Sequence, residues 1–507
     1  MPRPDYEEFK RLCNGSNLVP LWCDILVDMD TPVSLFTKLL HGTHAFLLES
    51  LEGGEKWGRY SFIGLRPLFT FGCQGNEVFI EEGGRRSRFE PICSSEGLVD
   101  PISAFRRIMA DFKVAETPGL PRFYGGAVGY LGYDMVRFME RLPSRLQDAM
   151  GFHDAFFMIP ELLLVFDNLR HTLKIICNIR PSCFGSLRAA YSHACSSIEG
   201  VVNDIQKGVY YPASISSKRT TGALLTPEVS RERFVDMVGR VKAYIEAGDV
   251  IQVVLSQRFS GKNIIPTFNL YRALRRINPS PYLYYIRFGD ETLIGSSPEI
   301  LVRLTGNEIE LRPIAGTRPR GRDDEEDRRL EAELLASDKE RAEHLMLVDL
   351  GRNDVGRVAK MGSVRVDDLM TVERYSHVMH IVSGVRGELA PGRDMFDVLK
   401  ACFPAGTVTG APKIRAMEII EELEHARRGP YAGAVGYFGF SGNMDMAITI
   451  RTLCQKGEML YLQAGAGIVA DSDPDKEWEE TINKGKALMK AIDMAARPFA
   501  MTEEEGC

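Results

Sequence analysis

The feature that most constrains the fold is a ten-residue motif that occurs twice. The segment GGAVGYLGYD at residues 125–134 returns as AGAVGYFGFS at residues 432–441. Solenoid repeats recur about every 20 to 50 residues, so two copies roughly 300 residues apart do not indicate a solenoid. A coincidence between two glycine-rich strands would also produce such a pair. We favour a duplication, in which each half of the chain contributes an equivalent glycine-rich strand to a layered sheet.

The length of the chain also favours two halves, because 507 residues exceed what one hydrophobic core usually serves. Residues 1–215 combine short β-rich runs with glycine-rich turns, and residues 216–225 have the Ser, Thr and Gly content of a linker. Residues 226–507 hold the clustered polar groups. Their first segment, TPEVSRERFVDMVGRVKAYIEAGD, predicts a helix capped by Thr226 and ended by Gly248.

Composition and charge exclude several classes of protein. With 44% hydrophobic and 26% charged residues, the chain has the make-up of an ordinary globular protein. Its formal net charge is −7 and no basic face is evident, which argues against binding to nucleic acid or to a membrane surface. No apolar run approaches the roughly 20 residues of a membrane span. Ten scattered cysteines without close pairs fit a reduced, cytoplasmic setting.

Two pairs of glutamates share one spacing. Glu340 and Glu343 precede the apolar run LMLVDL, and Glu477 and Glu480 follow the segment DSDPDK. Residues three apart on a helix lie on one face, where two like charges repel each other. Both pairs could be solvated helix faces. If one site unites them it needs a cation, and we expect magnesium, which prefers a few carboxylates plus water and an anionic ligand.

Other polar groups in the second half suit a small anionic ligand. Arg451, in AITIRTL, is predicted to lie mid-strand, either as a structural ion pair or as a carboxylate clamp. The segment LYLQAGAGIVADSD predicts a strand leading into a glycine-rich turn, whose N–H groups can approach an anion. His380 lies in a strand-like run, where a histidine is more often a hydrogen-bonded core residue than a functional one.

These residues belong to motifs that resemble those of the chorismate-utilising enzymes. The resemblance is greatest to the component I family of anthranilate synthases, whose members are the large subunits. It is dense from about residue 226 to 495 and extends to LLES and GRYSFIG in the first half. Seven motifs occur in the family's order: PIAGTRPRG, EHLMLVDLGRND, VMHIVSGVRG, PAGTVTGAPK, YAGAVGYFG, QAGAGIVADSDP and ETINKGKA.

The resemblance implies a fold and a reaction. The fold is an α/β (α+β) layered sandwich of two large antiparallel β-sheets with flanking helices and duplicated halves. In the reaction, ammonia attacks ring carbon 2 of chorismate as the hydroxyl on carbon 4 leaves, which gives aminodeoxyisochorismate. Elimination of pyruvate then yields anthranilate, the first step of tryptophan biosynthesis, with tryptophan as feedback inhibitor.

Residue roles follow from the same resemblance, motif by motif. Glu340 and Glu477 are outer-shell or acid candidates, and His380 matches the histidine associated with pyruvate elimination. The expected catalytic residues are His380, Glu340 and Thr407, the magnesium ligands are Glu343 and Glu480, and the substrate-binding residues are Gly316, Thr317, Tyr431, Arg451, Gly465, Ala466 and Gly467. In this set, Tyr431 and Arg451 would hold the enolpyruvyl carboxylate, and the backbone amides of residues 465–467 would meet the ring carboxylate.

Two positions separate this chain from close relatives. Aminodeoxychorismate synthases commonly carry a nucleophilic lysine where Ala315 stands, and Ala315 cannot replace it. Isochorismate and salicylate synthases place a lysine that activates water where this chain has Gln252, which cannot act as a base. The resemblance therefore implies ammonia as the nucleophile and anthranilate as the product.

A regulatory tryptophan site is implied in the first half. Glu49 and Ser50 of LLES match the family's feedback site, together with Pro281, Tyr282 and Leu283 of NPSPYLYY. LLES alone could be an ordinary strand end. Several relatives carry Met at the position of Leu283, a swap that conserves apolar volume, so we expect inhibition to survive with altered strength.

The source of ammonia is expected to be another chain. No G-x-C-x-G elbow of a glutaminase surrounds any of the ten cysteines, so we predict a separate glutamine amidotransferase subunit in a heterotetramer. Three alternatives remain: an aminodeoxychorismate synthase, a catalytically inactive tryptophan sensor, and a phenazine-type enzyme that stops at aminodeoxyisochorismate.

Overall fold

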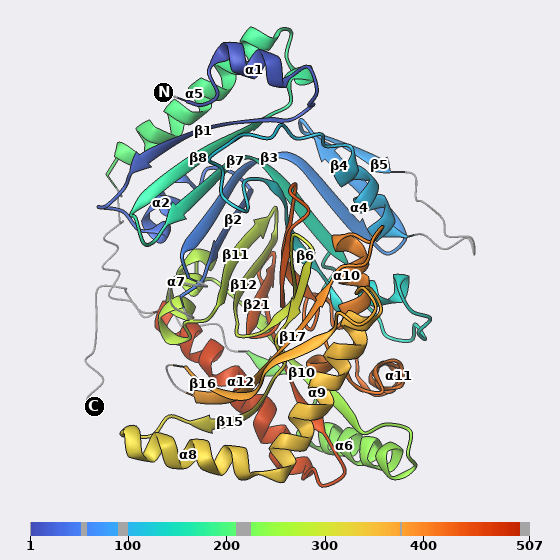
Figure 1. The fold of residues 1–507 in the computed structure, drawn as a ribbon. Coiled ribbons are helices and arrows are strands. Elements are labelled where there is room, and N and C mark those ends of the chain that lie inside the picture. Colours follow the sequence, from blue (N-terminus) through green and yellow to red (C-terminus); the bar gives the residue numbers. More distant parts are fainter. Residues whose placement is uncertain (1, 52–57, 90–99, 209–224, 376–377, 497–507) are drawn as a thin grey trace.

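The computed structural model describes residues 2–51, 58–89, 100–208, 225–375 and 378–496 (Figure 1). The predicted linker, residues 216–225, lies outside this part of the chain except for Leu225. None of the helices in the described ranges is long and apolar enough to cross a membrane.

Two sheet arms spread from one pair of long neighbouring strands, β3 (Tyr60–Gln74) and β7 (Ala155–Asp167). From β3 the first arm continues through β2 (His44–Glu49), β11 (Tyr282–Phe288), β12 (Glu291–Ser297), β21 (Thr452–Lys456), β22 (Met459–Ile468) and β10 (Gln252–Lys262). From β7 the second arm continues through β6 (Gly126–Leu131), β19 (Ala434–Gly439), β20 (Met444–Ile448), β13 (Ile300–Thr305), β14 (Glu308–Leu311) and β17 (Val378–Glu388).

Shorter or outer strands complete both arms, and every pairing between named strands is antiparallel. These strands are β1 (Val19–Leu26) and β8 (Thr172–Ile179) beyond β7, β4 (Glu77–Glu82) and β5 (Arg85–Phe89) beyond β3, β9 (Thr226–Pro227) and β18 (Gly410–Ala411) on β10, and β15 (Ile314–Pro319) and β16 (Arg365–Arg374) on β17. The predicted antiparallel α/β architecture is confirmed, with its two arms joined through β3 and β7.

Helices cover the outside of the strands (Figure 1). On the first half they are α1 (Tyr6–Leu12), α2 (Pro32–Leu39), α4 (Pro101–Ala110) and α5 (Leu187–Gln206), with the short 3-10 segment η1 (Tyr133–Phe138). On the second half they are α6 (Arg231–Glu246), α7 (Thr267–Ile277), α8 (Asp324–Ala336), α9 (Asp338–Gly356), α10 (Met395–Cys402), α11 (Lys413–Leu423) and α12 (Pro474–Ala495), with η3 (Gly406–Val408).

The repeated glycine motif forms two strands, β6 and β19, that pair with each other. Gly129 and Gly436 occupy the same position in the two copies and lie directly opposite in this pair. A side chain at either position would collide with backbone, because an ideal Cβ would lie 1.9 Å from Phe156 O at Gly129 and 2.0 Å from Asp445 O at Gly436. A local twofold axis through the pair explains this register, which supports the predicted duplication.

Neither half closes its sheets alone. The β6–β19 and β2–β11 pairings both cross from the first half to the second. A hydrophobic cluster likewise joins residues such as Leu47 and Leu162 to Leu453 and Leu462. The two halves therefore share sheets and cores.

The start of the second half differs from its prediction. Thr226 and Pro227 pair with Ser260 and Phe259 of β10, so they belong to a strand. The helix α6 begins after Ser230, whose side chain accepts a hydrogen bond from the N–H of Arg233. The prediction of Thr226 as the cap was wrong because a strand partner distant in sequence takes up that segment.

Candidate active site

Both glutamate pairs lie on helices, as their spacing predicts. Glu340 and Glu343 lie in the first turns of α9, which follows the cap Ser337. Glu477 and Glu480 lie near the start of α12, where the Asp473 side chain accepts from two backbone N–H groups. Glu340 and Glu477 thus lie in the first turn of each helix, where the helix dipole favours negative charge, and Glu343 and Glu480 lie one turn further along.

The carboxylates of the two pairs influence one another. Burial raises the pKa of Glu343, and the charges of Glu340 and Glu480 raise it further. Burial also raises the pKa of Glu477, again with a contribution from Glu480. The Lys484 ammonium lies 2.7 Å from Glu480 Oε1 and opposes part of this repulsion. The structure thus brings the predicted carboxylates into one electrostatic unit.

A second member of this unit, besides Glu480, is already paired. Glu340 Oε1 lies 3.2 Å from Arg318 Nη1, so this carboxylate is less available than Glu343. Within the described residues, no three His, Cys, Asp or Glu side chains form a ready-made metal cage. Magnesium takes one or two protein carboxylates together with water and ligand oxygens, and the hard oxygen donors of Glu343 and Glu480 fit that use.

His380 lies on β17, opposite Thr317 of β15. Its Nδ1 is 2.9 Å from Gly316 O and 3.1 Å from Thr317 Oγ1. A carbonyl oxygen only accepts, so Nδ1 carries the hydrogen and Nε2 keeps a lone pair. Burial lowers the pKa of His380, and the Arg451 charge lowers it further. The neutral imidazole can therefore take up a proton through Nε2.

Gly316 brings the β15 strand close to α9. Its φ is +67°, which favours glycine, and it lies at the register shift between Ala315 and Thr317. A Cβ at Gly316 would lie 3.1 Å from Glu340 Oε2. The predicted residues Gly316, Thr317, His380 and Glu340 are thus neighbours.

The glycines of QAGAGIVADSDP lie within strand β22, where a turn was predicted. Gly465 O accepts a hydrogen bond of 2.8 Å from Lys484 Nζ, so the backbone groups of Gly465 face α12. The opposite residue in β10, Ser256, donates its N–H to Glu424 instead of to β22. Because backbone groups alternate along a strand, Gly467 shares the open edge with Gly465, whereas Ala466 turns its N–H toward β10.

Arg451 does not lie mid-strand as predicted. It precedes β21 with a φ of +51°, in the connection between two strands. Its Nη1 donates to Lys484 O at 2.7 Å. Burial lowers the pKa of Arg451, and Tyr431 and Glu480 act in the opposite direction. The connector thus presents a buried guanidinium next to Tyr431.

Two functional candidates, Glu299 and Lys484, are absent from the sequence prediction. Burial raises the pKa of Glu299 to about 8, while Thr407 and Lys484 act in the opposite direction. Thr407 lines the same pocket as Glu299. Glu299 is therefore a protonated acid at neutral pH. Its signal in the sequence was a carboxylate between two apolar runs, in LIGSSPEILVRL.

The five residues of the expected tryptophan site line one pocket, which opens to solvent. These residues are Glu49, Ser50, Pro281, Tyr282 and Leu283. The pocket lies between strands of both halves, with β2 and β11 paired along one side. Tyr437 of the repeated motif also lines it.

The ionised groups of this pocket have partners. Glu49 accepts from Tyr271 at 2.5 Å and from Arg275 Nε at 2.9 Å. Asp445 accepts from Tyr282 and from Arg303, each at 2.9 Å. The pocket thus combines aromatic walls with paired charges.

Comparison with known proteins shows the family to which the chain is similar. The sequence profile of the family described as chorismate binding enzyme matches residues 51–490. The chain is 50% identical over 490 residues to anthranilate synthase component 1 of Aquifex aeolicus, covering 96% of this chain and 97% of that one. It is 48% identical over 496 residues to the same component of Acetivibrio thermocellus, covering 97% and 99%.

A solved structure has the same fold at moderate identity. The crystal structure of anthranilate synthase component I from Streptococcus pneumoniae TIGR4 matches with a TM-score of 0.74 and 36% identity, covering 92% of this chain and 98% of that one. A menaquinone-specific isochorismate synthase from Escherichia coli, at 20% identity, 96% and 98% coverage and a TM-score of 0.66, shares the fold.

Proposed function

The chain belongs to the chorismate-binding enzyme family, and from this membership we propose that it is the large subunit of an anthranilate synthase. It converts chorismate and ammonia to anthranilate, pyruvate and water through aminodeoxyisochorismate, and it serves tryptophan biosynthesis in the cytoplasm. The observation that carries the proposal is 50% identity to a component 1 relative over nearly the whole of both chains.

Substrate binding uses the residues that surround Lys484. Arg451 and Tyr431 hold the enolpyruvyl carboxylate, because a guanidinium fork fits a carboxylate. The open backbone edge of Gly465 and Gly467 donates to the ring carboxylate. The N–H of Ala466 points toward β10, which removes it from this predicted role.

Magnesium is the proposed cofactor, held by Glu343 and Glu480. The support is the donor set: burial and the charges of Glu340 and Glu480 raise the pKa of Glu343, and a bound cation would stabilise these grouped carboxylates. When bound, the ion supplies Lewis-acid polarisation of the ring carboxylate. The protein contributes the orientation of that carboxylate through its backbone edge.

Two groups on the chain handle protons. Glu299 is buried with a pKa of about 8, so it can donate a proton to the hydroxyl that leaves carbon 4 as water. His380 presents an unprotonated Nε2, which suits removal of the ring proton as pyruvate is eliminated. Gln252 and Ala315 offer no amine, so ammonia forms the new bond to carbon 2.

Regulation by tryptophan is proposed at the pocket lined by Glu49, Ser50 and Leu283. An aromatic pocket with a few convergent polar groups suits an amino acid that carries an indole. The support is the convergence of five residues from two distant motifs on one pocket.

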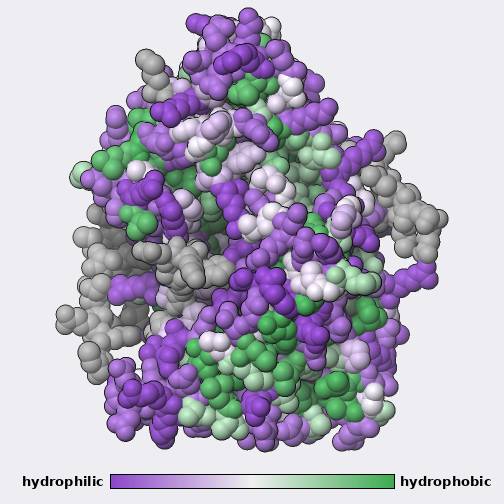
Figure 2. Space-filling view, viewed as in Figure 1, coloured by the Kyte–Doolittle hydropathy of each residue, from purple (hydrophilic) through white to green (hydrophobic). Residues whose placement is uncertain are grey.

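A glutamine amidotransferase subunit is the proposed partner, in a heterotetramer. Figure 2 shows apolar side chains gathered over the lower part of one face, where α6, α9 and α11 lie in Figure 1. Leu345 on α9 is 44% exposed and lies two residues after Glu343, and Ile251, just before Gln252, is 62% exposed. Such a surface offers a contact close to the site that receives ammonia.

The test is product identification with the purified chain. Chorismate, magnesium and ammonium salt should yield anthranilate fluorescence and one pyruvate per anthranilate without a partner. Formation of 4-amino-4-deoxychorismate, or of aminodeoxyisochorismate without pyruvate, would contradict the assignment. Loss of chorismate turnover altogether, with retained tryptophan binding, would identify a sensor instead of an enzyme.

A further inference from the structure

A buried ion pair behind the active site has no role in the mechanism above. Arg428 donates to both carboxylate oxygens of Glu424, over 2.6 and 2.9 Å, and the two side chains are 1% and 2% exposed. Placing two charges in the interior is costly, and such a pair is weak evidence of a stabilising role. Its other contacts indicate what it does.

The Arg428 guanidinium bonds two segments that carry active-site residues. Its Nη1 donates to Val408 O at 2.7 Å, next to Thr407. Its Nη2 donates to Val254 O at 2.8 Å, and Val254 lies opposite Gly467 in the sheet. One side chain thus fixes the positions of η3 and β10.

The Glu424 carboxylate bonds to Ser256, which lies two residues after Val254 in β10. It accepts from Ser256 N at 2.9 Å and from Ser256 Oγ at 2.7 Å. Ser256 lies opposite Gly465 in a pair without ladder hydrogen bonds, so the N–H of Ser256 points away from β22 to Glu424 while the Gly465 backbone faces α12. Glu424 therefore holds β10 at the position opposite the proposed carboxylate-binding edge.

The same guanidinium lies between two tyrosines. Its central carbon is 5.6 Å from the ring centre of Tyr431 and 4.7 Å from that of Tyr133. Tyr431 in turn covers Gly465, where an added Cβ would lie 2.7 Å from its hydroxyl oxygen. Cation–π attraction at such distances stabilises both rings.

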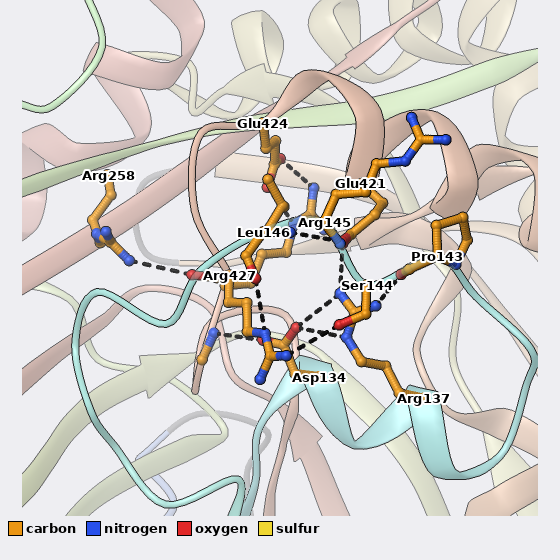
Figure 3. A network of polar contacts seen from close by, with 12 residues as sticks. Asp134, Arg137, Pro143, Ser144, Arg145, Leu146, Arg258, Glu421, Glu424 and Arg427 are labelled. Carbon is orange, nitrogen blue, oxygen red and sulfur yellow. Dashed lines mark hydrogen bonds and ion pairs between the residues drawn. The ribbon is translucent and has the colours of Figure 1, made fainter. Parts of the chain in front are cut away.

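The first half of the chain braces this arrangement (Figure 3). Tyr133 N donates to Gly429 O at 2.7 Å, and Gly429 N donates to Asp134 at 3.1 Å. Farther along, Arg427 Nε donates to Leu146 O, while Leu146 N donates to Glu421. The backbone between Arg427 and Tyr431 is therefore held by η1 and the segment after it.

We propose that Glu424 and Arg428 form a positioning pair for chorismate, which aligns the Tyr431 ring, the Gly465 edge and the Thr407 segment without touching the substrate. This inference rests on the proposed function. The pair holds three parts of one site. Its loss should therefore disturb the position of bound chorismate at all three of them, and not at one contact alone.

The experiment compares four variants by steady-state kinetics and thermal unfolding. In Arg428→Met the KM for chorismate should rise about 10- to 100-fold, since small misplacements carry costs of that size, while the KM for ammonium stays unchanged. In Arg428→Lys the charge persists but cannot bond both carboxylate oxygens and two carbonyls, so the Tm should stay near the original while the KM for chorismate rises. Arg415→Met, an exposed arginine on α11, is the control and should change neither value.

The double variant Glu424→Leu/Arg428→Met separates positioning from stability. Replacing a buried pair with apolar side chains often restores stability, so its Tm should recover while the KM for chorismate stays raised. Recovery of the original KM together with the Tm, or an original KM in Arg428→Lys, would overturn the inference. If the unaltered chain makes no anthranilate with ammonium and magnesium, the proposed function fails before any variant is compared.

Discussion

The two pockets of the molecule differ in how their charges are compensated. In the pocket lined by β2 and β11, Glu49 is bonded to Arg275 and Tyr271, and Asp445 is bonded to Arg303. In the candidate active site, burial raises the pKa of Glu343, and the charges of Glu340 and Glu480 raise it further. The first pocket pairs each of its two carboxylates with an arginine, whereas the second groups several carboxylates that shift one another's pKa.

This difference between the pockets matches two functions, reversible ligand binding and catalysis. A site with paired charges can bind and release a ligand without changing its own protonation. A site with carboxylates of shifted pKa and a neutral histidine suits cation binding and proton transfer. Groups with shifted pKa values are typical of catalytic sites. Changes in the active site should therefore act on turnover, and changes in the other pocket should act on inhibition alone.

The largest effect is expected for Glu343→Gln. A Lewis acid contributes several kcal/mol to a reaction, so loss of its ligand should lower kcat about a thousandfold or more. Anthranilate fluorescence against magnesium concentration measures this change. Glu479→Gln is the control, because Glu479 is exposed on α12 like its neighbour Glu480 but faces another side of the helix, so this variant should keep full activity. A near-normal kcat in Glu343→Gln would contradict the claim that the active site, unlike the other pocket, controls turnover through its carboxylates.

A large effect is also expected for Glu299→Gln, because general-acid catalysis contributes about 10²- to 10⁴-fold. Glu299 must be protonated to act, so activity of the unaltered enzyme should fall as the pH rises through about 8. The variant should lose this alkaline limb in its pH–rate profile. An unchanged limb would show that another group donates the proton.

The same carboxyl predicts a pH dependence of stability. The pKa of Glu299 is raised from 4.5 to about 8 in the folded chain. Between these values the folded state binds more protons than the unfolded state, so the free energy of unfolding falls as the pH rises. Thermal unfolding across this range should show a weaker slope for Glu299→Gln.

A smaller effect, confined to inhibition, is expected for Ala447→Leu. Ala447 lines the pocket beside Asp445, and a larger side chain there occupies ligand space. Overpacking costs about 1–3 kcal/mol, so the inhibition constant for tryptophan should rise about tenfold or more. The kcat should change less than about twofold. Ala247→Leu, an exposed position at the end of α6, is the control; equal losses of turnover and inhibition would contradict the separation.

The smallest effect is expected for Leu283→Met. Leu283 lies in the pocket wall and is 1% exposed. A swap that conserves volume costs less than about 1.5 kcal/mol, which limits the change of the inhibition constant to roughly tenfold. Inhibition assays with tryptophan and its analogues measure it. Abolished inhibition would mean that the pocket depends on a specific shape of this side chain.

Sequence patterns predicted the features that depend on local spacing. The glutamates of α9 and α12 follow helical periodicity, His380 lies in its predicted strand, and the repeated glycine motif forms the two equivalent strands that it predicts. Each of these three predictions depends only on the order of neighbouring residues, which can be read from the sequence. The motif resemblance supplied the remaining site residues.

Features set by distant partners could not be predicted in this way. Glu299 acquires its raised pKa from burial between segments far apart in sequence. Arg451 looks like a strand residue until the positive φ of its connector is known. The Gly465 edge faces α12 because of the register between β10 and β22, a long-range pairing that no local pattern records.

The pairing of β6 with β19 also fixes an order of events during synthesis. The ribosome completes β6 roughly 300 residues before β19, and contacts at such separation form slowly. Until then the edges of β6 and β2 stay open, which favours association with other chains. We infer that the first half stays incompletely folded until the second half is synthesised. The yield of the protein in cells should therefore depend on chaperones that hold unfolded chains, even if the folded protein is stable.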